Sequence, residues 1–67
     1  MDGASKPRRA LRAGSRIEAR HRGQREWFKG VITRVQRAVT SGTYYFSVRY
    51  DDGESEEGVR RYRLRRD

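Results

Sequence analysis

The sequence predicts a small all-β domain, built as a strongly bent, five-stranded antiparallel barrel. From Gly14 onward, apolar and polar side chains alternate with a period of two, which is the signature of half-buried strands. Turn signals rich in glycine and aspartate separate the alternating runs, and no apolar stripe with the 3.6-residue period of a helix occurs. Because a closed barrel leaves few exposed strand edges, we expect the short strands to close on themselves.

The first two expected strands differ in how their apolar residues are distributed. Residues 16–22 alternate regularly between charged and less polar side chains, and a turn at 23–24 follows. The longer run over 25–36 carries apolar residues on both faces, with Gly30 in its middle. This pattern indicates a strand that bends sharply and serves two surfaces. The faces of the longer run are predicted to hold Trp27, Val31 and Val35 on one side and Phe28 and Ile32 on the other.

The remaining expected elements are short and are separated by clear turns. A polar loop over 37–42 precedes a strand over 43–50, and a turn over 51–53 follows because Asp and Gly accept a positive φ at little cost. A short acidic strand over 54–59, a tight turn over 60–62 and a last short strand complete the barrel. The predicted core consists of Ile17, Ala19, Val31, Ile32, Val35, Phe46, Val48, Val59 and Leu64.

Length and composition restrict the class of protein. The 67 residues carry 17 lysines and arginines against 9 acidic residues, which gives a net charge of +8. No apolar run approaches the ~20 residues of a transmembrane helix, and the absence of cysteine excludes disulfides and thiolate metal sites. We expect residues 1–13 to form a disordered basic tail or linker and residues 14–66 to form the domain. No secretory signal is recognisable, so we expect a soluble intracellular module of a larger protein, without membrane contact.

Short motifs follow one another in a recognisable order after the expected tail. They are Gly14-x-x-Ile17-x-Ala19, Trp27-Phe28-x-Gly30-x-Ile32, Tyr44-x-Phe46-x-Val48-x-Tyr50-Asp51-Asp52-Gly53-Glu54, Glu57-x-Val59 and Leu64-Arg65. In order and spacing the series resembles a Tudor domain of the Royal superfamily, over essentially all of residues 14–66. The resemblance implies an SH3-like five-stranded barrel, which agrees with the period-two pattern.

Tudor domains bind methylated lysine or arginine in an aromatic cage at one end of the barrel, so the resemblance implies such a ligand here. The matching cage positions are His21, Phe28, Tyr50, the acidic Asp52 and Glu54 after the turn glycine. A methylammonium group is a poor hydrogen-bond donor and is held by cation–π attraction to ring faces beside a carboxylate. Because His21 replaces the usual Trp or Tyr, the cage is partial. Imidazoles ordinarily protonate near pH ~6.5, so binding is expected to fade below that pH.

The leading functional prediction is a non-catalytic reader that engages a methylated or basic peptide. A histone tail, chromatin and the nucleus are the partner and location that the resemblance implies. No cofactor is expected. An enzyme is not expected either, because the sequence offers no cysteine, no Ser-His-acid set, no phosphate-binding glycine loop and no set of metal ligands.

Two alternatives remain open at this point. Alternation would place Arg61, Arg63 and Arg65 along one face of the last strand, as a cationic strip that could bind the phosphates of DNA or RNA. The chain could also be a structural interaction module that binds an unmodified protein partner or a neighbouring repeat. The net charge of +8 favours the nucleic-acid alternative, whereas the two intact aromatic cage positions favour the reader.

Overall fold

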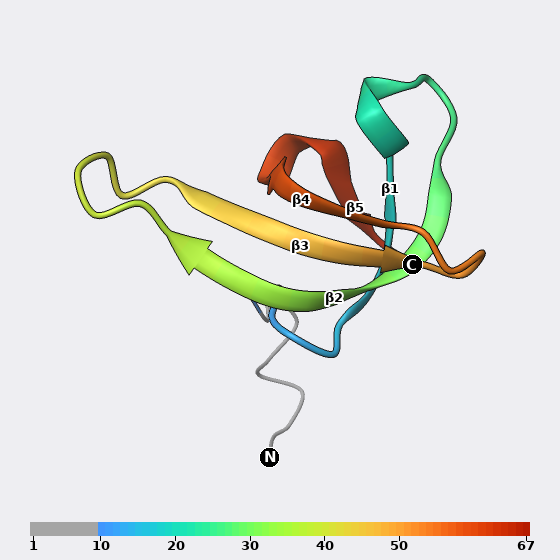
Figure 1. Ribbon diagram of the computed structural model, residues 1–67, viewed down its shortest axis with the longest axis horizontal. Helices are drawn as coiled ribbons and strands as arrows, with labels where there is room; N and C mark the ends of the chain where they lie inside the picture. The colour runs from blue at the N-terminus through green and yellow to red at the C-terminus, as the bar shows by residue number, and fades with distance from the viewer. Residues whose placement is uncertain (1–9) are drawn as a thin grey trace, which may run out of the picture.

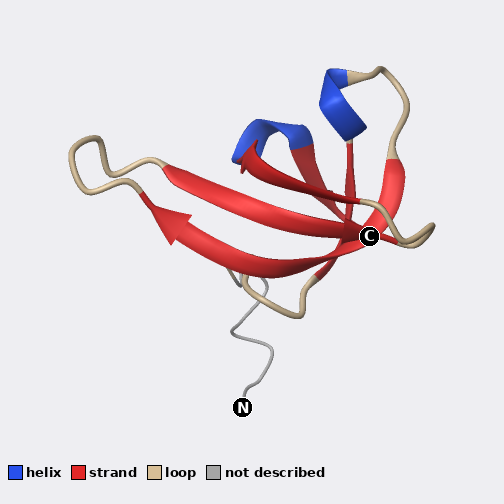
Figure 2. Ribbon diagram, viewed as in Figure 1, coloured by secondary structure: helices blue, strands red, loops and turns tan. Residues whose placement is uncertain are grey.

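The computed structural model of the chain describes residues 10–67, which form five β-strands and two single turns of 3-10 helix (Figure 1, Figure 2). In chain order the elements are β1 (Arg16–Ala19), η2 (His21–Gly23), β2 (Phe28–Arg37), β3 (Tyr44–Tyr50), β4 (Ser55–Arg60), η3 (Arg61–Arg63) and β5 (Leu64–Arg66). All strand pairs are antiparallel and belong to one sheet, in the order β4-β3-β2-β1-β5. The prediction of an all-β, five-stranded antiparallel domain is confirmed.

Strand β2 is the element that bends the sheet into a barrel-like shape. Its first residues pair with β1 and most of its length pairs with β3, and the two pairings overlap at Gly30 and Val31. Figure 1 shows β2 as a long curved strand that leads from the short β1 into the extended hairpin with β3. A Cβ atom at residue 30 would lie 2.6 Å from the backbone oxygen of Arg49. Glycine is therefore required where β2 and β3 approach each other so closely.

A β-bulge in β2 changes which of its side chains face the core. Thr33 is an extra residue between neighbours that pair with consecutive positions of β3. Ile32, before the extra residue, is buried. Because the extra residue shifts the following side chains to the other face, Val35 packs against the same core as Ile32. The prediction that Val31 and Val35 share a face opposite Ile32 is therefore wrong. Val31 is half-buried and lies outside the core cluster.

The hydrophobic core combines aliphatic side chains with two aromatic rings. Its buried members are Leu11, Ile17, Ala19, Ile32, Phe46, Val48, Tyr50, Val59 and Leu64. Leu11 and Tyr50 are members that the period-two pattern did not predict. Leu11 is 8% exposed although it precedes the expected domain boundary at Gly14, so the packed part of the chain includes residue 11. The remainder of the expected tail, residues 1–9, lies outside the described residues.

The two 3-10 turns shift element boundaries relative to the sequence prediction. Strand β1 ends at Ala19, so His21 begins η2 instead of closing the first strand. The reason is local, because Arg22 and Gly23 adopt φ values of 53° and 76°, which a strand cannot accommodate. At the other end, η3 occupies residues 61–63, so the last strand begins at Leu64. Among residues 10–67, no helix is long and apolar enough to cross a membrane.

Candidate aromatic site

Antiparallel pairing brings the predicted cage residues to one end of the sheet. His21 begins η2, Phe28 begins β2 and Tyr50 ends β3, while Asp52 and Glu54 lie in the turn between β3 and β4. All five line one pocket with a volume of about 210 Å³. Lys29 and Asp51 complete its lining. The residues chosen from the sequence are thus neighbours in space, and what they bind stays a prediction.

The three rings of the pocket are steeply inclined to one another. The ring centroids of His21 and Tyr50 are 4.9 Å apart, with an angle of 71° between the planes. Phe28 lies 6.3 Å from His21 and 6.5 Å from Tyr50, at angles of 86° and 87°. Separations of this size allow one cation to lie within the ~6 Å range of cation–π attraction from all three centroids. The arrangement can therefore hold a small cationic group between aromatic surfaces.

The three rings differ in how much of their surface meets solvent. Phe28 is 37% exposed and forms the outer wall, whereas Tyr50 is 4% exposed and belongs to the hydrophobic core as well. The Tyr50 hydroxyl donates a hydrogen bond to Glu56 Oε1 at 2.9 Å. Burial, together with this bond to an anionic partner, raises the pKa of Tyr50 well above its ordinary value. Tyr50 is therefore a fixed, neutral wall, while Phe28 is the ring that solvent and ligand can reach.

Glu56, in β4, ties together the elements that carry the rings. Its carboxylate accepts the Tyr50 hydroxyl, the backbone N–H of Arg22 at 3.2 Å and Nη2 of Arg63 at 2.8 Å. Burial acts to raise the pKa of Glu56, but the hydrogen bonds from Arg63, Arg22 and Tyr50 outweigh it and hold the pKa below its ordinary value. Arg63 continues the connection, because its Nε also donates to the backbone oxygen of Arg20 at 3.2 Å.

The sequence prediction missed the role of Glu56 because of a second β-bulge. Plain alternation in the fourth strand would put Glu56 on the face opposite the buried Val59. Strand β4, however, has an extra residue between the partners of Phe46 and Val48, and Gly58 adopts a φ of 71° there. The bulge brings Glu56 to the inner side with Val59. The signal that could have shown this is a glycine inside a predicted strand.

The mouth of the pocket is acidic. Asp51 is paired with Arg16, whose Nη1 and Nη2 donate hydrogen bonds to the two Asp51 carboxylate oxygens, each at 3.3 Å. Asp52 Oδ1 accepts the backbone N–H of Glu54 at 2.9 Å, a bond that shapes the turn. Within residues 10–67, neither Asp52 nor Glu54 has a lysine or arginine partner at ion-pair distance. These two carboxylates are available to a cationic ligand.

His21 contributes an unsatisfied nitrogen to the same mouth. Its Nε2 atom is buried and has no hydrogen-bond partner in the described part of the chain. Oε1 of Glu54 lies 3.4 Å from it, within ion-pair distance but without a hydrogen bond. No group of three or more acidic or histidine side chains that could hold a metal ion occurs among residues 10–67.

The predicted cationic strip of Arg61, Arg63 and Arg65 does not form. Because η3 replaces the start of the expected strand, strand alternation does not apply to the first two of these residues. Arg63 is only 16% exposed and is paired with Glu56. Arg65 pairs with Glu18 at 2.7 Å and lies 4.1 Å from the ring centroid of Trp27. The nucleic-acid alternative therefore loses this strip, and the net charge of +8 remains its support.

No protein-family model, no curated protein and no solved structure matches this chain. The fold and the site define a small, barrel-like antiparallel β domain with an acid-edged aromatic pocket. The resemblance to Tudor domains stays a prediction made from the motifs.

Proposed function

We propose that this domain is a non-catalytic binding module that holds a methylated lysine or methylated arginine side chain of a peptide in the aromatic pocket. The observation that carries the proposal is the convergence of His21, Phe28 and Tyr50, with interplanar angles of 71° to 87°, beside two carboxylates without a lysine or arginine partner in residues 10–67. On the Tudor resemblance, the barrel would be SH3-like, a histone tail is the kind of partner to expect and chromatin in the nucleus is the place to expect it.

The chemistry of the pocket favours a methylated cation over an unmodified one. A lysine ammonium is a compact, strongly hydrated charge, so an aromatic pocket cannot replace its hydration shell. Methylation spreads the charge over a larger, less hydrated surface that ring faces can attract. The volume of about 210 Å³ lies below the ~300–1,000 Å³ of sites for drug-sized ligands, as expected for a site that takes only the tip of a side chain.

Local charge also supports a cationic ligand in this pocket. The chain as a whole has a net charge of +8 and would repel a basic peptide overall. Asp52 and Glu54 provide negative charge at the pocket itself, so attraction is confined to this end of the molecule. Affinity is expected to be modest, because few contacts are buried and the rest of the surface opposes the ligand.

Phe28 gives the cleanest test of the proposal, because Tyr50 also supports the core. Affinity for a short peptide with one trimethyl-lysine is measured by isothermal titration calorimetry, beside the unmethylated peptide and a dimethyl-arginine peptide. Phe28→Ala should weaken binding of the methylated peptide about 2- to 30-fold, equivalent to ~0.5–2 kcal/mol for one cation–π contact. Phe28→Leu keeps an apolar side chain without the ring and should lose a similar amount.

A matched control comes from the hairpin tip. Val39 is 97% exposed, and Val39→Ala removes exposed apolar surface away from the pocket without touching it. This variant should bind like the wild type. Equal affinity for methylated and unmethylated peptides, or unchanged affinity in both Phe28 variants, would contradict the proposal.

A further inference from the structure

A second surface, independent of the aromatic pocket, exposes aromatic rings among arginines. Tyr62 is 76% exposed and Tyr44 is 50% exposed, so both rings present surface to solvent. Both line an open groove between the β2–β3 hairpin and η3. The lining residues of this tyrosine–arginine groove are Gly42, Thr43, Tyr44, Arg60, Arg61 and Tyr62.

Arginine side chains lie near the rings of this surface. The guanidinium of Arg60 lies 5.6 Å from the ring centroid of Tyr45 and 5.9 Å from that of Tyr62. The guanidinium of Arg37 lies 5.6 Å from the ring centroid of Tyr44. These distances lie within the ~6 Å range of cation–π attraction. Each exposed tyrosine is therefore covered by an arginine on one side and still leaves ring surface open to a further planar group.

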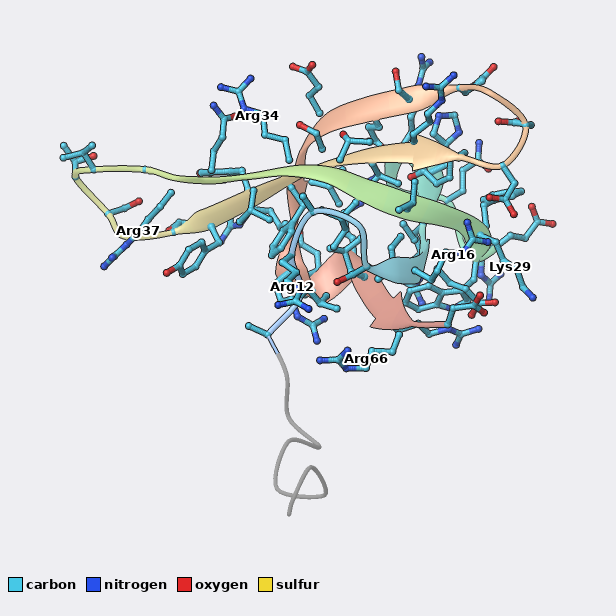
Figure 3. The ribbon with its side chains drawn as sticks, turned by 90° about the horizontal axis from the view of Figure 1, so that it is seen from below. Arg12, Arg16, Lys29, Arg34, Arg37 and Arg66 are labelled. Atoms are coloured by element: carbon cyan, nitrogen blue, oxygen red, sulfur yellow. The ribbon has the colours of Figure 1, made fainter. Side chains whose placement is uncertain are left out.

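The charge of the groove is positive and is not neutralised locally. No acidic residue lines it. Arg61 donates Nη1 to the backbone oxygen of Leu64 at 2.8 Å, but a guanidinium has five N–H donors, so others remain for a ligand. Figure 3 shows Arg37 on the hairpin at the opposite end of the molecule from Lys29, which lines the aromatic pocket. The groove and the aromatic pocket share no lining residue, and they are opposite in charge.

An apolar hollow adjoins the groove. It is lined by Ala10, Leu11, Val35, Tyr44, Phe46 and Arg61, so it shares two residues with the groove. A ligand lying across Tyr44 therefore meets apolar surface on one side and arginine on the other. This combination suits a polymer of planar aromatic groups joined by anionic linkers.

We propose that the tyrosine–arginine groove binds single-stranded nucleic acid, with bases stacked on Tyr44 and Tyr62 and phosphates contacted by Arg37, Arg60 and Arg61. Stacking on aromatic side chains combined with a cationic groove is the general chemistry of single-strand recognition. A duplex offers phosphates but keeps its base faces covered by neighbouring pairs, so it cannot use the rings. An acidic peptide could use the arginines, yet it has no planar groups for the exposed tyrosines.

Fluorescence anisotropy of labelled oligonucleotides tests the inference on the whole chain. The probes are a 12-nucleotide oligo(dT), a 12-nucleotide oligo(U), a 12-base-pair duplex and a poly-glutamate peptide of matched length. We expect the single strands to bind at ~50 mM salt and to weaken steeply as salt rises, with a log–log slope of about −0.7 for each neutralised phosphate. The duplex and the acidic peptide should bind more weakly than both single strands.

Substitutions at an exposed ring distinguish the contribution of base stacking to binding from that of positive charge. Tyr62→Ala should weaken oligo(dT) binding at least about fivefold, the lower end expected for the loss of one stacked base. Tyr62→Phe retains the ring and should stay within about twofold of the wild type. Arg60→Ala should weaken binding and flatten the salt dependence, whereas Arg25→Ala removes an equal charge in the exposed loop between η2 and β2 and should do neither.

Three results would overturn the inference. These are no binding of either single strand at ~50 mM salt, a duplex or acidic peptide that binds as tightly as the single strands, or Tyr62→Ala binding like the wild type. Because Tyr62 is 76% exposed, its replacement is not expected to unfold the domain, and circular dichroism of the variant verifies this.

Discussion

At the scale of single residues, the connection between Tyr50 and Glu56 links the core to the candidate pocket. The Tyr50 ring packs in the core and also forms one wall of the pocket. Its hydroxyl is bound by a carboxylate that also accepts bonds from the η2 backbone and from Arg63. The geometry of the pocket therefore depends on a polar group that does not line it.

Removing the Glu56 carboxylate gives a pH-dependent prediction. The pKa of Glu56 is lower in the folded state than its ordinary value of 4.5, so the charged form stabilises the fold above that pH and this stabilisation is lost as the pH falls below it. Glu56→Gln should lower the free energy of unfolding by about 1.5–3 kcal/mol at pH 7, the range for hydrogen bonds to a charged group. The difference from the wild type should shrink below pH 4.5.

Urea unfolding followed by Trp27 fluorescence at several pH values measures this difference. Glu57→Gln is the matched control, because Glu57 is its exposed neighbour in β4, and it should change stability by less than about 0.5 kcal/mol. A stability difference for Glu56→Gln that stays constant from pH 7 to pH 3 would show that its charge does not act as described.

At the scale of elements, the bend in β2 positions the site. Phe28 lies two positions before Gly30, where β2 pairs with both β1 and β3. Gly30 is opposite Tyr50 in the β2–β3 register. The distance between the Phe28 and Tyr50 rings is therefore set by how closely the two strands approach at this glycine.

Gly30→Ala should impair stability and binding together. The added Cβ would lie 2.6 Å from the backbone oxygen of Arg49, so β2 and β3 must separate, at a cost of about 1–3 kcal/mol for an overpacked site. The displaced Phe28 should also weaken methylated-peptide binding. Thermal unfolding and calorimetry measure the two effects, and Thr33→Ala at the exposed bulge is the control. Wild-type stability in Gly30→Ala would argue against the close approach.

The sequence predicts the buried side chains correctly in strands where apolar and polar residues alternate without interruption. Ile17 and Ala19 in β1, and Phe46 and Val48 in β3, are buried as predicted. Alternation fails in β2 and β4, where bulges at Thr33 and Gly58 add one residue and exchange the faces. A period-two pattern contains no marker for such an insertion except a glycine or polar residue out of place.

The sequence was enough to predict which aromatic residues line the candidate site, but not the Arg63–Glu56 pair that supports them. Phe28 and Tyr50 lie at strand ends, and His21 lies in η2 just after β1, so antiparallel order was enough to predict their proximity. The pairing of Arg63 with Glu56 joins η3 to β4, and a contact between two charged side chains leaves no apolar pattern in the sequence. The same contact removes Arg63 from the cationic strip that alternation suggested.

At the scale of the whole molecule, charge is unevenly distributed. The net charge is +8, yet Asp51, Asp52 and Glu54 gather at the aromatic pocket. The tyrosine–arginine groove has no acidic lining. One domain thus presents an anionic pocket suited to a cationic side chain and a cationic surface suited to an anionic polymer.

A titration of the ¹⁵N-labelled domain with a trimethyl-lysine peptide, followed in ¹H–¹⁵N correlation spectra, shows whether the aromatic pocket binds a methylated cation. We expect the largest shifts at the amides of η2, Phe28 and residues 50–54, with much smaller shifts for the unmethylated peptide at equal concentration. Shifts that are equal for the two peptides, or that map to the tyrosine–arginine groove instead of the aromatic pocket, would contradict the assignment of this pocket as a methyl-cation site.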